Sequence, residues 1–156
     1  MGLNWRQFEL GVLRDVGSNW TEVTVRLIGE TLWHESDRLH ALGQYPHPAD
    51  DMGQDSVQVF GPGLGIASIE RETWNWMRGT PEGSQVLMGC WYESLTWDLR
   101  LNVVACRLRY KLDPSPLPLL AGGIEARADY WWKVYNRGKV DRRPDYIRNA
   151  RAILWA

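Results

Sequence analysis

Apolar side chains recur at helical spacing along much of the chain, and this pattern predicts a series of helices. A first helix is predicted from Asn4, as its N-cap, to about Asp15, where the Gly17-Ser18-Asn19 segment ends it. A second helix is predicted to start near Thr21. It carries apolar residues at spacings of three and four, namely Val25, Ile28 and Leu32.

Four more helices are predicted further along the chain. One runs from about Glu70 to Arg78, with Gly79 at the position that follows a helix end. The next carries apolar residues from Leu95 to Tyr110 and stops before Pro114, because proline disfavours helix in the residue that precedes it. A third follows the apolar positions from Ile124 to Tyr135, and a last one runs from Pro144 to Trp155.

The segment from His40 to Gly65 has a different character, because glycines and prolines interrupt it too often for a long helix. A short alternation of polar and apolar residues at 56–60 predicts a small strand or hairpin there. No repeat or linker divides the sequence. We therefore expect residues 1–156 to form a single α+β domain, mainly helical, with a small β/loop lobe.

The composition of the chain argues against several classes of protein. The chain has 156 residues and a formal net charge of −1, which gives no support for nucleic-acid binding. Its apolar runs are too short to span a membrane, and its start lacks the pattern of a secretory signal. Two cysteines make no disulfide framework and are expected in the core. The unusual count is ten tryptophans, since indole rings serve both as core residues and as platforms for ring-shaped ligands.

Glu35 is the carboxylate that breaks the helical pattern. It lies seven residues after Ile28, which returns it to within roughly 20° of the same apolar face. Burial at a helix C-terminus disfavours the charged form of a carboxyl group and raises its pKa. A protonated carboxylic acid near neutral pH is what a general acid in glycoside cleavage needs. The alternative is that Glu35 lies just past the helix end and is solvated.

Four segments of the chain carry a family resemblance. The run from Glu30 to Leu39 resembles the Glu-Ser motif at the helix end of lytic transglycosylases and other lysozyme-like proteins. The run from Gly61 to Trp74 resembles their Gly-x-x-Gly-Leu-x-Gln-x-x-Pro-x-Thr segment, in a form nearest to proteins of tailed phages. The run from Asn102 to Tyr110 is similar to the helix that follows in that family, and Trp131 to Asn136 to its final Tyr-Asn motif. The four segments keep the family's order over about residues 25 to 150.

The resemblance implies a lysozyme-like fold in which Glu35 is the catalytic acid/base. It also implies a set of substrate-binding residues: Ser36 would orient Glu35 or the substrate, Tyr135 and Asn136 would line the floor of the saccharide cleft, and Ile66 to Ile69, Ser68 included, would contact the sugars. Two positions depart from the family pattern. Ser68 stands where the family has Gln and lacks the amide that can both donate and accept, and Arg71 stands where the family has Pro.

The resemblance implies a peptidoglycan-cleaving muramidase of the lytic transglycosylase type, in which one acid serves both proton transfers and gives a 1,6-anhydro product. A hydrolytic mechanism would need a second carboxylate, for which Asp55 is the best candidate in the sequence. We expect no cofactor and no metal, because His40, His47 and the neighbouring aspartates are too scattered for a metal site. His34, about 100° around the helix from Glu35, is not expected to be a catalytic partner.

The resemblance to tailed-phage proteins also implies the partners of the protein and the place where it acts. Peptidoglycan glycan strands and other proteins of the phage tail are the expected partners, and neither nucleic acid nor a membrane is. The protein would be made in the host cytoplasm and act in the host periplasm. It would be carried there in the virion, which the resemblance favours, or be released through a pore made by another protein. The alternative is a structural or adaptor protein of the tail that keeps the fold with little activity. Helical phase assigns Trp74 and Trp131 to the core and leaves Trp76 and Trp132 for a cleft wall or a protein contact.

Overall fold

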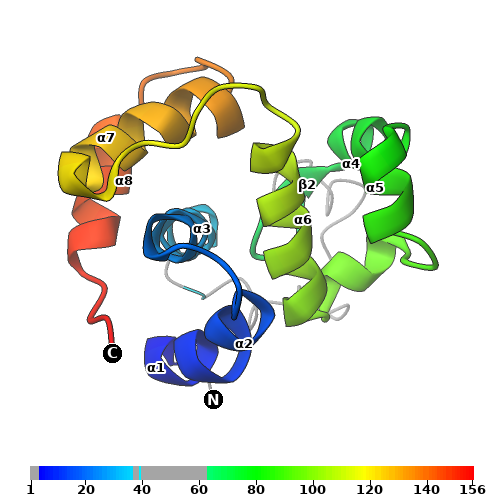
Figure 1. The fold of residues 1–156 in the computed structure, drawn as a ribbon, viewed down its shortest axis with the longest axis horizontal. Coiled ribbons are helices and arrows are strands. Elements are labelled where there is room, and N and C mark those ends of the chain that lie inside the picture. Colours follow the sequence, from blue (N-terminus) through cyan, green and yellow to red (C-terminus); the bar gives the residue numbers. More distant parts are fainter. Residues whose placement is uncertain (1–3, 37–38, 40–62) are drawn as a thin grey trace, which may run out of the picture.

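The central element of the fold is helix α3 (Glu22–Glu35), seen end-on in Figure 1. A computed structural model of the chain describes residues 4–36, 39 and 63–156. Around α3 lie the N-terminal helices, α6 (Leu99–Lys111), α7 (Gly123–Tyr130) and α8 (Arg143–Arg151). Helices α4 (Arg71–Arg78) and α5 (Pro81–Val86) lie on the far side of α6 from α3.

The N-terminal helix begins at the predicted N-cap but changes its pitch. Asn4 accepts a hydrogen bond from Gln7 and completes a capping box, and the helix then passes through α1 (Trp5–Phe8), a π-helical turn η1 (Glu9–Leu13) and α2 (Arg14–Val16). A π turn inserts one residue and shifts the helix phase. Leu13 is therefore fully buried, whereas Val12, which regular α-helical spacing from Phe8 would place on the buried face, is only partly buried.

Helix α3 is buried on most of its circumference. The helix starts near Thr21 as predicted, and Thr21 caps it by accepting from the backbone N–H of Thr24. The apolar residues Val25, Leu27, Ile28 and Leu32 are all in the core. Gly29 allows the N- and C-terminal segments to approach, since a Cβ there would lie 2.7 Å from the Trp155 ring and 2.9 Å from the Trp5 ring. These two indoles meet edge to face with 4.9 Å between centroids.

The small lobe contains a short antiparallel hairpin. Strand β1 (Gly63–Leu64) pairs with β2 (Ile69–Glu70), and α4 follows directly. The hairpin predicted at 56–60 lies outside the described residues. Helix α5 was not predicted; Thr80 caps it, and Pro81 occupies its first turn. A 3₁₀ turn, η3 (Tyr92–Thr96), then leads back to α6.

Two predicted helix boundaries are wrong. Leu95 belongs to η3, and α6 starts at Leu99 because Asp98 caps it by accepting from the backbone N–H of Leu101 at 2.9 Å. The last helix ends at Arg151 and does not reach Trp155. Between them the chain passes through η4 (Leu120–Gly122), α7 and a π-helical turn η5 (Trp131–Tyr135).

An ion pair lies inside the helical lobe, between α3 and α7. Arg127 donates from Nε and Nη2 to Glu30, at 2.8 Å each, and Tyr146 of α8 donates its hydroxyl to the same carboxylate at 3.2 Å. Glu30 is fully buried and Arg127 nearly so. The pair therefore ties three helices together inside the core, where breaking it would strand a charge.

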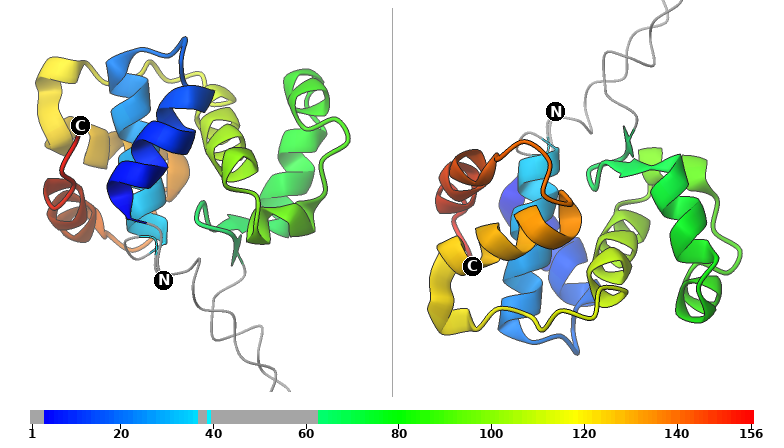
Figure 2. Two further views of the ribbon diagram at one scale, coloured as in Figure 1. Left: turned by 90° about the horizontal axis from the view of Figure 1, so that it is seen from below. Right: turned by 90° about the horizontal axis from the view of Figure 1, so that it is seen from above.

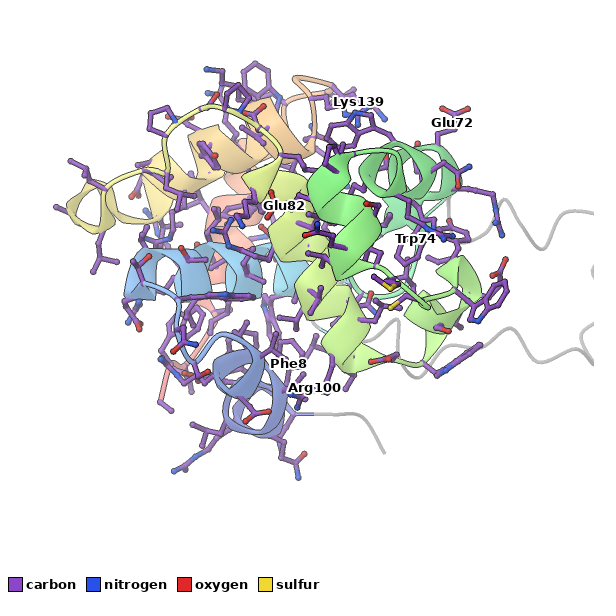
Figure 3. The ribbon with its side chains drawn as sticks, turned by 45° about the vertical axis from the view of Figure 1, so that its right-hand side comes forward. Phe8, Glu72, Trp74, Glu82, Arg100 and Lys139 are labelled. Atoms are coloured by element: carbon purple, nitrogen blue, oxygen red, sulfur yellow. The ribbon has the colours of Figure 1, made fainter. Side chains whose placement is uncertain are left out.

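Tryptophans occupy both the core and the surface. Trp74 and Trp131 are buried as predicted, and Trp76 is exposed. In the view of Figure 3, Trp74 lies below α4, and Phe8 points from α1 into the molecule. The most exposed indoles are Trp91 and Trp97, which the pattern did not single out. Within the described ranges, no helix combines the length and the apolar character that crossing a membrane requires.

Candidate functional site

Glu35 is the last residue of α3, and its carboxylate lies against Trp131 of η5. The Trp131 indole N–H donates to Glu35 Oε1 at 3.0 Å, across 96 positions of sequence. The side chain of Glu35 is partly buried rather than solvated beyond the helix end. The neutral indole N–H occupies one carboxyl oxygen of Glu35, so the other oxygen can carry a proton.

Burial raises the pKa of Glu35 above its usual value near 4.5. The hydrogen bond from Trp131 opposes this shift, as do the positive charges of Arg109, Arg142 and Lys139, but the net direction is upward. The site therefore favours the protonated form of Glu35 compared with an exposed glutamate. A carboxyl group whose pKa is raised by burial is the kind of group that general acid catalysis uses.

Trp131 is held firmly behind Glu35. Its ring stacks on Tyr146 with 5.1 Å between centroids, and it meets the His34 ring edge to face at 4.8 Å. His34 in turn lies 2.9 Å from the side-chain amide of Asn149 through Nδ1. The sequence assigned Trp131 to the core but did not identify it as the partner of Glu35. The signal that was missed is the indole N–H of Trp131, because a buried tryptophan needs a hydrogen-bond acceptor for this group.

Ser36 has a local role in the structure. Its hydroxyl donates to the Leu32 carbonyl at 2.5 Å and accepts from the Leu39 backbone N–H at 2.9 Å. These bonds join the last turn of α3 to Leu39. Because Ser36 is buried, it positions the backbone beside the acid and does not present its hydroxyl to solvent.

The turn between β1 and β2 is fixed to α6 by Asn102. Asn102 accepts from the Ala67 backbone N–H at 3.1 Å and donates to the Leu95 carbonyl at 2.7 Å. Gly65 has φ +70°, and a Cβ there would lie 2.2 Å from Asn102 Oδ1, so the turn requires glycine. Asn102 is a polar residue inside an apolar stretch of helix, which is the sequence signal that could have identified it.

The predicted sugar-contacting residues of this turn differ in exposure. The side chain of Ile66 is fully buried, which leaves only its backbone for a ligand. Ser68 is partly exposed and has φ +50°, a left-handed conformation that is unusual for a residue with a Cβ.

Tyr135 joins the turn to the helical lobe. Its hydroxyl donates to the Ala67 carbonyl at 2.5 Å, and its ring lies 3.9 Å from the Arg109 guanidinium carbon. Tyr135 is nearly fully buried, and burial raises the pKa of its hydroxyl well above the usual value. Asn136 next to it is partly exposed and donates to the Val140 carbonyl at 3.2 Å.

Three segments far apart in the sequence therefore meet: the end of α3, the β1–β2 turn and η5. Figure 2 shows the end of α3, the hairpin and the segment after α7 on the same side of the molecule. Within the described ranges, the non-glycine residues with positive φ are Leu39, Ser68 and Arg137, one in or beside each segment. Each such conformation costs roughly 1–3 kcal/mol, and such strain clusters at functional sites.

The candidate second carboxylate and the loop histidines belong to a part of the chain that is not described. His40, His47, Asp50, Asp51 and Asp55 all lie outside the described residues. In the part of the chain that the structure describes, no group of three or more His, Cys, Asp or Glu side chains is suited to hold a metal ion.

Comparison of the chain with protein-family models, with curated proteins and with solved structures returned no match. The geometry of the site therefore supplies the basis for assigning a function.

Proposed function

We propose that the chain has a lysozyme-like fold and is a peptidoglycan-cleaving muramidase of the lytic transglycosylase type, carried in the tail of a phage. The observation that carries this proposal is the carboxyl group of Glu35. It lies at a helix end with its pKa raised by burial, and its Oε1 is held by Trp131. The resemblance noted in four ordered segments supplies the substrate class.

The reaction needs one acid. Protonated Glu35 donates its proton to the glycosidic oxygen that leaves, as the bond from C1 of N-acetylmuramic acid to that oxygen breaks. The Glu35 carboxylate then removes a proton from the 6-hydroxyl of the same sugar. The 6-oxygen bonds to C1 and closes a 1,6-anhydro ring, so Glu35 ends protonated and no water is consumed.

The neighbouring residues would hold the substrate and the acid in place. Trp131 fixes the carboxyl group by its hydrogen bond, while Ser36 joins the last turn of α3 to Leu39. The glycan would contact the backbone of Ile66 and the exposed parts of Ser68 and Asn136. The hydrogen bond from the Tyr135 hydroxyl to the Ala67 carbonyl holds the β1–β2 turn against η5. The partners in this proposal are glycan strands in the host periplasm and other proteins of the phage tail.

A structural or adaptor role in the tail is the second candidate. Two observations favour it. Ser68 lacks the amide group of the family's Gln, and Trp91 and Trp97 are exposed to 73% and 65%, which leaves large apolar surfaces for protein contacts.

The test is clearing of purified murein by the wild type, by Glu35→Gln and by Glu125→Gln, in a zymogram and in a turbidity assay. Glu125 is exposed on α7 and provides the same chemical change away from the site. We expect clearing by the wild type and Glu125→Gln, and a loss of at least about 100-fold in Glu35→Gln, since general acid catalysis contributes roughly 10²–10⁴-fold. Mass spectrometry should find 1,6-anhydro ends.

Equal clearing by wild type and Glu35→Gln would refute the catalytic assignment. No clearing by any of the three folded proteins would favour the structural role. Reducing ends in place of 1,6-anhydro ends would show hydrolysis and would make a second carboxylate such as Asp55 necessary.

A further inference from the structure

A groove of about 640 Å³ lies beside Tyr135, outside the set of residues that perform the proposed reaction. It is bounded by α4, by the C-terminal end of α6 with the residues after it, and by η5 with Arg137 beyond its end. Its volume is within the range of about 300–1,000 Å³ that is usual for sites of small ligands. We call it the cationic groove, after the basic residues that line it: Arg109, Lys133 and Arg137.

The three cations of the groove have no ion-pair partner among the residues that the structure describes. Two carboxylates also line the groove, but neither neutralises them by a salt bridge. Hydrogen bonding from the side chain of Ser115, and from its backbone N–H at 2.8 Å, lowers the pKa of Asp113, and the charge of Lys133 makes a smaller contribution. Glu72 projects outward from α4 (Figure 3).

Arg109 has a buried donor that is unsatisfied. Its Nη2 donates to the Tyr135 carbonyl, but its Nε is buried and has no hydrogen-bond partner in the described part of the chain. A buried polar group without a partner costs about 1–3 kcal/mol. Because Nε is buried, Arg109 contributes its positive charge to the groove and not a hydrogen bond from this atom.

Arg137 and Trp76 form a platform at the other side of the groove. The Arg137 guanidinium carbon lies 5.8 Å from the centre of the Trp76 ring, and Trp76 is 46% exposed. Arg137 has φ +55°, so the backbone holds this arginine at some cost in strain. A guanidinium over an indole is well placed to bind a carboxylate while the ring contacts the ligand's apolar part.

The cationic groove adjoins the proposed active site through Arg109. The Arg109 guanidinium lies over the Tyr135 ring, and its positive charge opposes the rise in the pKa of Glu35. The same turn, η5, supplies Trp131 to Glu35 and Lys133 to the groove. A glycan strand at Glu35 would therefore lie next to the groove. In peptidoglycan, the groups that branch from the glycan strand are short peptides with free carboxylates.

We propose that the cationic groove binds the carboxylates of these stem peptides. This inference rests on the proposed function and adds to it: the protein recognises peptidoglycan by the peptide beside the glycosidic bond as well as by the sugars. Lys133 and Arg137 attract the carboxylates, and Arg109 adds a third positive charge to the groove.

The experiment measures binding without cleavage. The probes are a soluble disaccharide–tetrapeptide and the same disaccharide without peptide, titrated by calorimetry against Glu35→Gln protein so that the probe stays intact. The test variant adds Lys133→Gln and Arg137→Gln. The control adds Arg6→Gln and Arg148→Gln, which remove the same net charge from exposed positions on α1 and α8.

We expect Lys133→Gln with Arg137→Gln to weaken binding of the peptide-bearing probe at least tenfold, with no change for the peptide-free probe or in the control. The effect should shrink as salt is added, since the attraction is electrostatic. Equal binding of the two probes, or an equal loss in the control, would overturn the proposal. So would inorganic polyphosphate displacing the peptide-bearing probe at concentrations far below those of a free tetrapeptide, because the groove would then select phosphate.

Cleavage is scored separately, so the two proposals can fail independently. Peptide-dependent binding without murein clearing would leave the groove assignment intact and refute the muramidase. Murein clearing with peptide-independent binding would leave the muramidase assignment intact and refute the groove assignment.

Discussion

Replacing Asn102 by alanine tests how the β1–β2 turn is held against α6. Asn102 is fully buried, and its side chain makes three hydrogen bonds to backbone groups. Two of these groups, the Ala67 N–H and the Leu95 carbonyl, belong to segments outside α6. The third, the Asp98 carbonyl, also accepts from the Asn102 backbone N–H at 3.1 Å and keeps that partner in the variant.

The expected loss of stability follows from the two backbone groups that lose their hydrogen-bond partner, the Ala67 N–H and the Leu95 carbonyl. A buried donor or acceptor that loses its partner costs about 1–3 kcal/mol, so Asn102→Ala should lower the free energy of unfolding by about 2–6 kcal/mol. That is a large share of the total for a single domain, which is about 5–15 kcal/mol. The variant should also weaken any activity of Glu35, because the turn that carries Ser68 and contacts Tyr135 loses its anchor.

The assay is urea unfolding followed by tryptophan fluorescence, with the midpoint and the slope determined for each protein. Asn75→Ala is the control, since Asn75 is exposed on α4 and should change stability by less than about 0.5 kcal/mol. A loss below about 1 kcal/mol in Asn102→Ala would show that the turn does not depend on this side chain, and it would refute the reasoning.

Two further predictions concern buried charges. Burial raises the pKa of Glu35, so the stability that wild type holds relative to Glu35→Gln should fall as pH rises above about 4.5 and level off above the raised pKa. A pKa that is higher by one in the folded state corresponds to a fall of about 1.4 kcal/mol, and a difference that stays constant across this pH range would contradict the prediction. Arg127→Leu should cost about 3–5 kcal/mol in urea unfolding, because Glu30 is left buried without its ion pair. Adding Glu30→Met should recover most of this loss, and a single-variant loss below about 1 kcal/mol would disprove the role of the pair.

Local sequence signals predicted the helices well where capping and phase act within a few residues. Asn4 caps its helix as expected, α3 starts near Thr21 as expected, and the apolar face of α3 is in the core. Errors arose where the backbone left regular α-helix. The π turn at Glu9–Leu13 shifted the buried face by one residue, and the Asp98 cap separated Leu95 from α6.

The candidate site was predicted unevenly for a similar reason. Helical phase alone placed Glu35 on the apolar face of its helix, and the structure has it partly buried with a raised pKa. Its hydrogen-bond donor, Trp131, lies 96 positions away, and so no spacing rule could pair them. Ser36 is predicted to orient the acid or the substrate, and in the structure its hydroxyl bonds to the backbone of Leu32 and Leu39.

By itself the sequence determined the mainly helical α+β class, the positions of most helix starts and the unusual place of Glu35. These depend on interactions between residues that are near neighbours along the chain, and their geometry is fixed by the helix period. Only the tertiary structure decided which side chains Glu35, Asn102 and Glu30 contact, since each partner comes from another segment of the chain. Packing brings such groups together, and their energies depend on burial that no local pattern specifies.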